Sequence, residues 1–193
     1  MRLVILGGTF DPVHVGHLSL VRGSCKVLDA SLGVIVVEGG HRHRTSTVAT
    51  LDDRRRLVQL AIDGDESLRE ASQMGIVGGL VGAVAQLKDL GHEVHVVFGS
   101  DSAGQLDRWN GRQLLRGARL WAVPRPGDPT GDSSGVGQLA VSVESVSATQ
   151  IRFAAAAGSR RQAVVPAPCR VWVDSLYGAS VTDRDGSVDC ESS

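Results

Sequence analysis

The chain is poor in residues that mark several common protein classes. Its 193 residues contain three cysteines and only two lysines, Lys26 and Lys88. Since neither lysine stands near the glycine-rich N-terminal segment and no Gly-Lys-Ser/Thr string occurs, the sequence speaks against a P-loop NTPase. Cys25, Cys169 and Cys190 are odd in number and widely spaced. They form neither a disulfide framework nor a metal-binding pattern, so we expect a reducing, cytoplasmic environment.

Long apolar runs and a strong net charge are also missing. No run is long enough to cross a bilayer, and the N-terminus reads as a strand rather than a signal peptide. The formal net charge is −1, so bulk charge indicates no nucleic-acid or membrane partner. Hydrophobic residues make up 42% of the chain, which suits one α/β domain. We expect it over residues 1–178, with a polar, disordered tail over 179–193. The oligomeric state is left open.

The N-terminal string LVILGGTFDPVHVGHL, residues 3–18, is the most informative part of the chain. Its apolar start predicts a buried parallel strand, and Gly7 and Gly8 then allow a tight turn with backbone N–H groups open to a ligand. A helix is predicted to follow, and a helix N-terminus is a natural anion site. His14 and His17 share one face there, where imidazoles can donate hydrogen bonds to phosphate.

Buried strands alternate with helices along the rest of the chain. This order predicts an α/β fold with a Rossmann-like, doubly wound parallel sheet in a single domain. The later strands are predicted over residues 33–37, 94–98, 120–123 and 139–143. The later helices are predicted over 51–63 and 80–90, in an Ala-rich stretch opened by residues 146–152, and over 169–176. Residues 64–79 give no clear pattern. Arg54, Arg55 and Arg56 are predicted to face solvent, although one of them could reach back to the anion site.

A basic loop follows the second predicted strand. Glu38 ends that strand. In a dinucleotide-binding Rossmann protein such an acid could hold a ribose hydroxyl, but the first turn lacks the G-x-G-x-x-G spacing. The loop then carries four basic or titratable side chains at the ligand-binding edge of the sheet: His41, Arg42, His43 and Arg44. They suit an anion clamp, with a solvated loop as the alternative.

Two further strings place polar groups at predicted helix starts. Gly99 and Asp101 follow a predicted strand, where Asp101 could accept from ribose or base donors or could cap a helix. Ser147, Thr149 and Arg152 belong to the string over residues 146–152 that opens a predicted Ala-rich helix. These groups can bind phosphate, and simple capping by the hydroxyls is the alternative.

The string GGTFDPVHVGH, residues 7–17, resembles the signature of the HxGH-type nucleotidyltransferases. It is closest to that of the nicotinate/nicotinamide mononucleotide adenylyltransferases. The resemblance extends to FGSDSAGQLDRW at 98–109, RPG at 125–127 and VSATQIR at 146–152, the last being similar to the family's I-S-S-T-x-I-R. It implies transfer of a nucleotidyl group from ATP or CTP to a phosphate or phosphonate oxygen of a small anionic acceptor, with release of pyrophosphate.

The resemblance also implies roles for individual residues. His14, His17 and Arg152 would be catalytic. The nucleotide would be bound by Gly7, Gly8, Thr9, Phe10, Gly99, Asp101, Ser147 and Thr149, and the acceptor by His41, Arg42, His43, Arg44, Trp109 and Arg125. Mg²⁺ would accompany the nucleoside triphosphate and bridge its phosphates through substrate and water, without protein ligands.

The predicted acceptor pocket departs from the family pattern. Nicotinate mononucleotide enzymes usually carry G-P-S-Y-T-x-D-T-L before the third helix, whereas residues 75–81 read GIVGGLV here, and Tyr177 is the only tyrosine. Because glycines replace the walls that a ring would need, the sequence predicts a small phosphate or phosphonate acceptor and poor use of nicotinate mononucleotide. The alternatives are a pyridine mononucleotide acceptor, an inactive nucleotide sensor, and a dinucleotide-binding protein.

Overall fold

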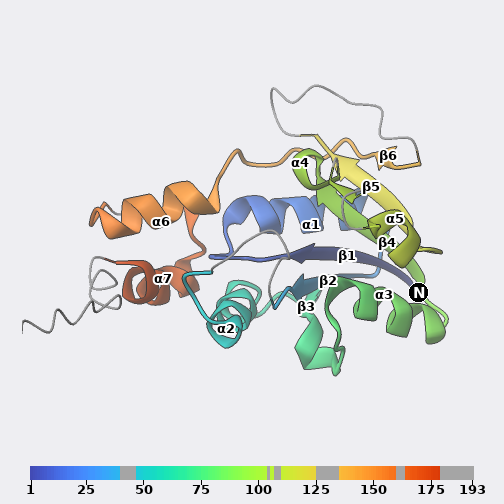
Figure 1. Ribbon diagram of the computed structural model, residues 1–193, viewed down its shortest axis with the longest axis horizontal. Coiled ribbons are helices and arrows are strands. Elements are labelled where there is room, and N and C mark those ends of the chain that lie inside the picture. Colours follow the sequence, from blue (N-terminus) through green and yellow to red (C-terminus); the bar gives the residue numbers. More distant parts are fainter. Residues whose placement is uncertain (40–46, 104, 107–109, 125–134, 160–163, 179–193) are drawn as a thin grey trace, which may run out of the picture.

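Six parallel strands form one sheet in the order β3-β2-β1-β4-β5-β6 (Figure 1). The computed structural model describes residues 1–39, 47–103, 105–106, 110–124, 135–159 and 164–178. Within these ranges the elements are β1 (Arg2–Gly8), α1 (Val15–Val27), β2 (Leu32–Val37), α2 (Leu51–Ala61), β3 (Leu68–Glu70), η1 (Ala71–Met74), α3 (Gly79–Asp89), β4 (Glu93–Gly99), α4 (Ser100–Ala103), α5 (Gly111–Leu114), β5 (Arg119–Val123), β6 (Gly137–Gln138), α6 (Ala148–Ala156), η4 (Ala167–Cys169) and α7 (Arg170–Tyr177).

The strand order confirms the predicted Rossmann-like, doubly wound fold. The chain moves outward from β1 to β2 and β3 on one side, and then through β4 to β5 and β6 on the other. The order reverses between β1 and β4, whose paired residues run from Arg2↔Glu93 to Leu6↔Val97. In open parallel sheets the crevice at the carboxyl ends of such a strand pair is where ligands bind.

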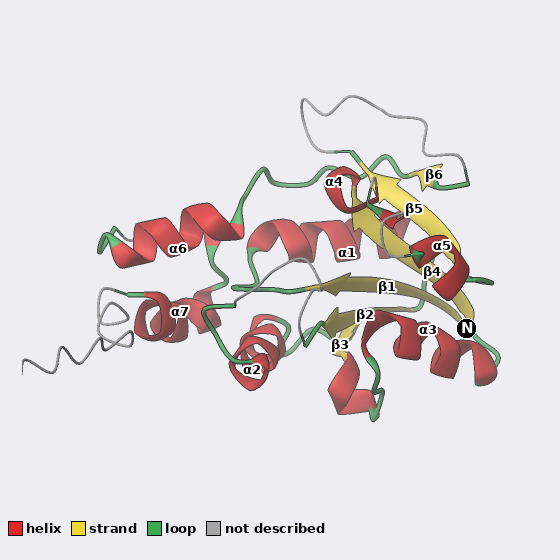
Figure 2. Cartoon of the chain, viewed as in Figure 1, coloured by secondary structure: helices red, strands yellow, loops and turns green. Residues whose placement is uncertain are grey.

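Helices cover both faces of the sheet, which explains why its central strands β1 and β2 are almost entirely apolar. Val4 and Leu6 of β1 belong to the core formed with α1 and α2, whereas Leu3 and Ile5 belong to the core formed with α3. In Figure 2, α6 and α7 lie beyond the carboxyl end of β1. Tyr177 of α7 and Ile151 of α6 join the first of these cores. No helix in the described ranges is long and apolar enough to span a membrane.

One predicted strand is absent, and one strand lies in a stretch for which no element was predicted from the sequence. Residues 64–79 contain the short strand β3 and the turn η1, and a three-residue strand is too short to give a periodic pattern. The predicted strand at 139–143 is absent, because pairing with β5 ends at Gln138. Val141 instead packs against α1, where a Cβ on Gly23 would come within 2.3 Å of it. The predicted tail, 179–193, lies outside the described residues.

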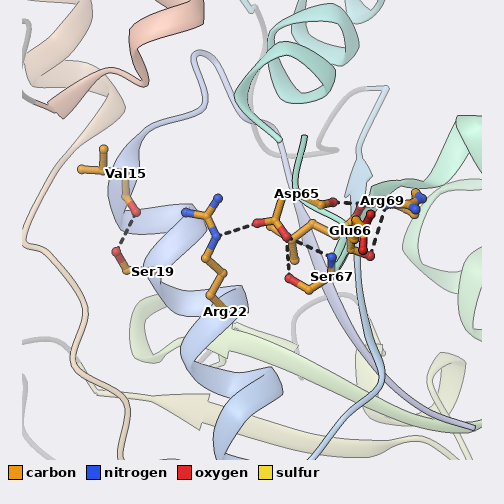
Figure 3. Close-up of polar contacts among 8 residues, drawn as sticks. Val15, Ser19, Arg22, Asp65, Glu66, Ser67 and Arg69 are labelled. Atoms are coloured by element: carbon orange, nitrogen blue, oxygen red, sulfur yellow. Dashed lines mark hydrogen bonds and ion pairs between the residues drawn. The ribbon is translucent and has the colours of Figure 1, made fainter. Parts of the chain in front are cut away.

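The turn before β3 is tied to α1 by a carboxylate (Figure 3). The Nε of Arg22 donates to Oδ2 of Asp65 at 2.9 Å, and the N–H and hydroxyl of Ser67 donate to Oδ1 at 2.9 and 2.6 Å. Burial raises the pKa of Asp65, but the hydrogen bonds from Ser67 and Arg22 outweigh burial, so the pKa lies below its ordinary value. The folded state therefore favours the ionised form.

Replacing Asp65 by asparagine should destabilise the fold in a pH-dependent way. A carboxyl whose pKa is lowered in the folded state stabilises the protein above its unfolded pKa, and this contribution is lost as the pH falls through the folded pKa. We expect the variant to lose about 1 kcal/mol of unfolding free energy at pH 7. The difference should shrink below about pH 4. Urea unfolding across this range measures it, with the exposed Asp63→Asn as control; a pH-independent difference would contradict the assignment.

Candidate active site

The loop between β1 and α1 is held in a conformation that few residues adopt. Phe10 has φ 50°, in the left-handed region that non-glycine residues usually avoid. Its side chain is 3% exposed and covers Gly8, where a Cβ would come within 3.1 Å of the ring. At Gly16 a Cβ would lie 2.8 Å from the carbonyl oxygen of Glu144, so glycine lets the chain before α6 approach α1. Such local strain is typical of a functional loop.

His14 and His17 stack on one another at the start of α1. Their ring centroids are 3.6 Å apart at 21°, and Phe10 meets His17 edge-on at 4.8 Å. The backbone N–H of His14 donates to Nδ1 of His17 at 3.3 Å. Nδ1 is therefore an acceptor, so the neutral His17 ring carries its proton on Nε2. This fixes one ring nitrogen of His17 as a hydrogen-bond donor.

Both histidines line a cleft at the point where the strand order reverses. The cleft is lined by His14, Gly16, His17, Leu20, Gly99, Val123, Val143, Glu144 and Val146. These residues come from the start of α1, the ends of β4 and β5, and the segment before α6. The structure thus brings the predicted His14, His17 and Gly99 together, beside the N–H groups of the first turn of α1, where an anion is favoured.

Arg152 of α6 reaches the loop between β1 and α1, residues 9–14, which is called the signature loop below. One terminal nitrogen donates to the carbonyl oxygen of Asp11 at 2.5 Å, and the other donates to the hydroxyl of Thr149 at 3.2 Å. Ser147 is the residue before α6, but its hydroxyl makes no capping hydrogen bond to the helix, so the capping alternative for Ser147 was wrong. The helix start that carries Ser147, Thr149 and Arg152 therefore lies against the loop before α1.

Asp11 anchors the loop instead of facing a ligand. Its Oδ1 accepts from the hydroxyl of Tyr177 at 2.6 Å and from the N–H of Ala49 at 3.2 Å, and its Oδ2 accepts from the N–H of Val48 at 3.0 Å. Burial, followed by the hydrogen bond to the Asp11 carboxylate, raises the pKa of Tyr177 above its ordinary value. Sequence reasoning missed this anchor; the only available signal was that Tyr177 is the sole tyrosine.

Arg54 was predicted to face solvent, with a reach back to the anion site by one of the three arginines as the alternative. The solvent prediction was wrong for Arg54. Its side chain lies on α2 and is 1% exposed. One terminal nitrogen donates to the carbonyl oxygens of Thr9 at 2.5 Å and Glu38 at 2.8 Å, and Nε donates to that of Ala49 at 3.3 Å. Burial lowers the pKa of Arg54 from its ordinary value, and the nearby Asp11 opposes that shift. Arg54 thus joins the signature loop to the end of β2.

Glu38 is also committed to a contact within the protein. Its Oε1 accepts the backbone N–H of Leu80 at 2.7 Å, at the start of α3. This differs from the ribose contact that a dinucleotide-binding Rossmann protein would need from an acid at this position.

The remaining predicted residues fall outside what the structure describes. His41, Arg42, His43, Arg44, Trp109 and Arg125 are outside the described ranges, and Asp101 is described only through its backbone in α4. Among the described residues, no three His, Cys, Asp or Glu side chains gather to hold a metal ion. Since the Asp11 carboxylate already accepts three hydrogen bonds from the protein, the donor set suits phosphate oxygens better than a metal cage.

Comparison with known proteins agrees with this geometry. Residues 5–154 match the family model described as Cytidylyltransferase-like. A probable nicotinate-nucleotide adenylyltransferase of Marinobacter nauticus is 31% identical, over 91% of this chain and 96% of the relative. One from Aquifex aeolicus is 30% identical over 64% of this chain and 77% of its own length. A Plasmodium falciparum nicotinic acid mononucleotide adenylyltransferase complexed with NaAD superimposes with a TM-score of 0.65, at 13% identity, over 82% of this chain and 86% of that one.

The fold, the cleft and these similarities together define an enzyme class: the chain is a nucleotidyltransferase with a Rossmann-like sheet. Within that class it belongs to the cytidylyltransferase-like family, and its relatives place it beside the nicotinate-nucleotide adenylyltransferases. The predicted family is therefore confirmed. The roles of the individual site residues stay predictions.

Proposed function

We propose that this chain transfers AMP from ATP to the phosphate of a pyridine mononucleotide, with release of pyrophosphate. The observation that carries the proposal is the pair of stacked histidines in the cleft at the start of α1, with Arg152 of α6 bound to the same loop. The relatives' names supply the substrate class. The open alternative of a pyridine mononucleotide acceptor thus replaces the main prediction, because nothing in the similarities supports a phosphonate.

The reaction needs positioning and charge stabilisation more than proton transfer. A phosphate monoester has its second pKa at about 6, so the acceptor oxygen is already ionised at neutral pH. The Nε2–H of His17, His14 and the first N–H groups of α1 would hold the triphosphate, and Arg152 and Thr149 would hold the leaving phosphates. Mg²⁺, held by phosphate oxygens and water, would neutralise part of the phosphate charge when bound.

A substrate matrix tests the proposal. The full chain with Mg²⁺ is assayed for pyrophosphate release with ATP or CTP against four acceptors: nicotinate mononucleotide, nicotinamide mononucleotide, a small phosphonate and a sugar phosphate. The dinucleotide product is identified by mass spectrometry. We expect release with ATP and a pyridine mononucleotide. Release only with a phosphonate, or no release with any pair, would contradict the proposal.

Arg152→Lys should weaken the use of ATP although it keeps the charge. Lysine offers one point donor where the guanidinium reaches both the Asp11 carbonyl and Thr149, so the KM for ATP should rise about tenfold, with a smaller change in kcat. Initial rates over a range of ATP concentrations measure this. The exposed Arg56→Lys on α2 is the matched control. An unchanged KM for ATP in Arg152→Lys would place this arginine outside the nucleotide site.

A further inference from the structure

Both C-terminal helices are joined to the signature loop through one residue, Asp11. From α6, Arg152 donates to the backbone carbonyl oxygen of Asp11 at 2.5 Å, and from α7 the hydroxyl of Tyr177 donates to its Oδ1 at 2.6 Å. The two helices lie beyond the carboxyl end of β1 (Figure 2). How Tyr177 holds the Asp11 side chain therefore also affects where the carbonyl oxygen that Arg152 contacts is placed.

The hydrogen bond between Tyr177 and Asp11 is buried and has a fixed direction. Both side chains are buried. Burial, followed by the hydrogen bond to Asp11, raises the pKa of Tyr177, and the charges of Arg152 and Arg54 oppose this shift. The phenol therefore stays protonated and donates to the carboxylate. Because water is excluded, this bond orients the carboxylate more firmly than an exposed one would.

The position of Arg152 depends on more than its own helix. Its contact with the hydroxyl of Thr149, three residues earlier on α6, measures 3.2 Å and is exposed. The chain that leads into α6, residues 139–147, contains no strand of the sheet. Ile151 of α6 shares a core with Tyr177 of α7, and the two helices pack against each other. α6 is thus located by α7 and the signature loop rather than by strand pairing.

We propose that Tyr177 is a positioning residue for the reaction: its hydrogen bond to Asp11 keeps the Arg152 guanidinium where it binds the phosphates of ATP. The inference rests on the part of the proposed function in which Arg152 holds those phosphates. A guanidinium that is already oriented loses less freedom when it binds phosphate, so the benefit falls on ATP affinity. Tyr177 does not touch the substrate, because Asp11 carries its effect to Arg152.

Tyr177→Phe tests this by removing the hydroxyl while keeping the ring in the core. Oδ1 of Asp11 still accepts the N–H of Ala49, so the carboxylate keeps a partner and the variant should fold. The control is Cys169→Ala, which removes a buried hydrogen bond from Sγ to the carbonyl oxygen of Leu57 at 3.2 Å. Cys169 immediately precedes α7, but its bond goes to α2 and not to the signature loop.

The dissociation constant for ATP with Mg²⁺ is measured by calorimetry, without acceptor, for the full chain and its variants. These are Tyr177→Phe, Arg152→Ala, the double variant and Cys169→Ala, and urea unfolding of each sample measures stability. We expect Tyr177→Phe to weaken ATP binding about fivefold in the wild type but less than about twofold in Arg152→Ala, because the group through which Tyr177 acts is then missing. Cys169→Ala should bind ATP as the wild type does, even where its urea midpoint falls as far as that of Tyr177→Phe.

Three results would overturn this inference and leave the proposed function intact: an unchanged ATP affinity in Tyr177→Phe, an equal loss with and without Arg152, or an equal loss in Cys169→Ala. The last two would indicate a general effect on the fold. Pyrophosphate release by the wild type with a pyridine mononucleotide tests the proposed function separately. Its absence would overturn that function without touching the coupling in ATP binding, and a wild type that does not bind ATP would overturn both.

Discussion

Replacing His17 by alanine should lower kcat/KM about a hundredfold or more and change the unfolding free energy by no more than about 1 kcal/mol. The large kinetic effect is expected because the hydrogen bond from the His14 backbone fixes the His17 proton on Nε2, in the wall of the cleft. A donor that is already oriented stabilises developing phosphate charge without reorganising. Steady-state rates together with urea unfolding of the same samples measure both quantities.

Two further variants make the His17 test specific. His92→Ala removes an imidazole at the opposite edge of the sheet, just before β4, and should leave the rate nearly unchanged. His17→Gln keeps a side-chain donor and should recover part of the activity that alanine loses. Activity of His17→Ala within a few-fold of the parent would remove His17 from the catalytic groups.

Replacing Arg54 by methionine should cost about 3 kcal/mol or more of unfolding free energy and should also lower kcat/KM. The guanidinium is buried, and its loss leaves the carbonyl oxygens of Thr9, Glu38 and Ala49 without their donor. Since Thr9 lies in the signature loop, the loop should lose part of its fixed geometry. Chemical denaturation and kinetics under the same conditions measure the two effects.

The neighbouring arginine provides the control for Arg54. Arg56 lies two residues further along α2 and is exposed, so Arg56→Met should change stability by less than about 0.5 kcal/mol. Arg54→Lys keeps a charge but cannot serve all three carbonyls, and it should fall between the methionine variant and the parent. Equal stability of Arg54→Met and Arg56→Met would show that the three contacts of Arg54 contribute nothing.

The parts of the site that could be predicted from sequence are those encoded by adjacent residues. The strand, the turn at Gly7 and Gly8 and the start of α1 follow one another directly, so their local preferences already place the two histidines of the cleft at a helix start. The segment over residues 146–152, which contains Arg152, could likewise be predicted to open a helix. The meeting of these two strings depends only on the carboxyl ends of parallel strands lying at one edge.

The parts that could not be predicted depend on contacts between distant segments. Three successive arginines on α2 form a pattern that usually indicates a solvated face, and only the carbonyls supplied by Thr9, Glu38 and Ala49 single out Arg54 for burial. The contact of Glu38 with Leu80 could not be predicted, because the two residues are 42 positions apart. β3 was missed because three residues give no periodicity.

The bond between Tyr177 and Asp11 has a consequence for synthesis of the chain on the ribosome. The two residues are 166 positions apart, which at about 5–20 residues per second corresponds to roughly 8–33 s of translation. Throughout that interval the nascent chain already carries both histidines, while the Asp11 carboxylate lacks its phenolic partner. α7 must leave the ribosome before the loop between β1 and α1 receives this hydrogen bond, so the loop lacks one of its supports until Tyr177 has emerged.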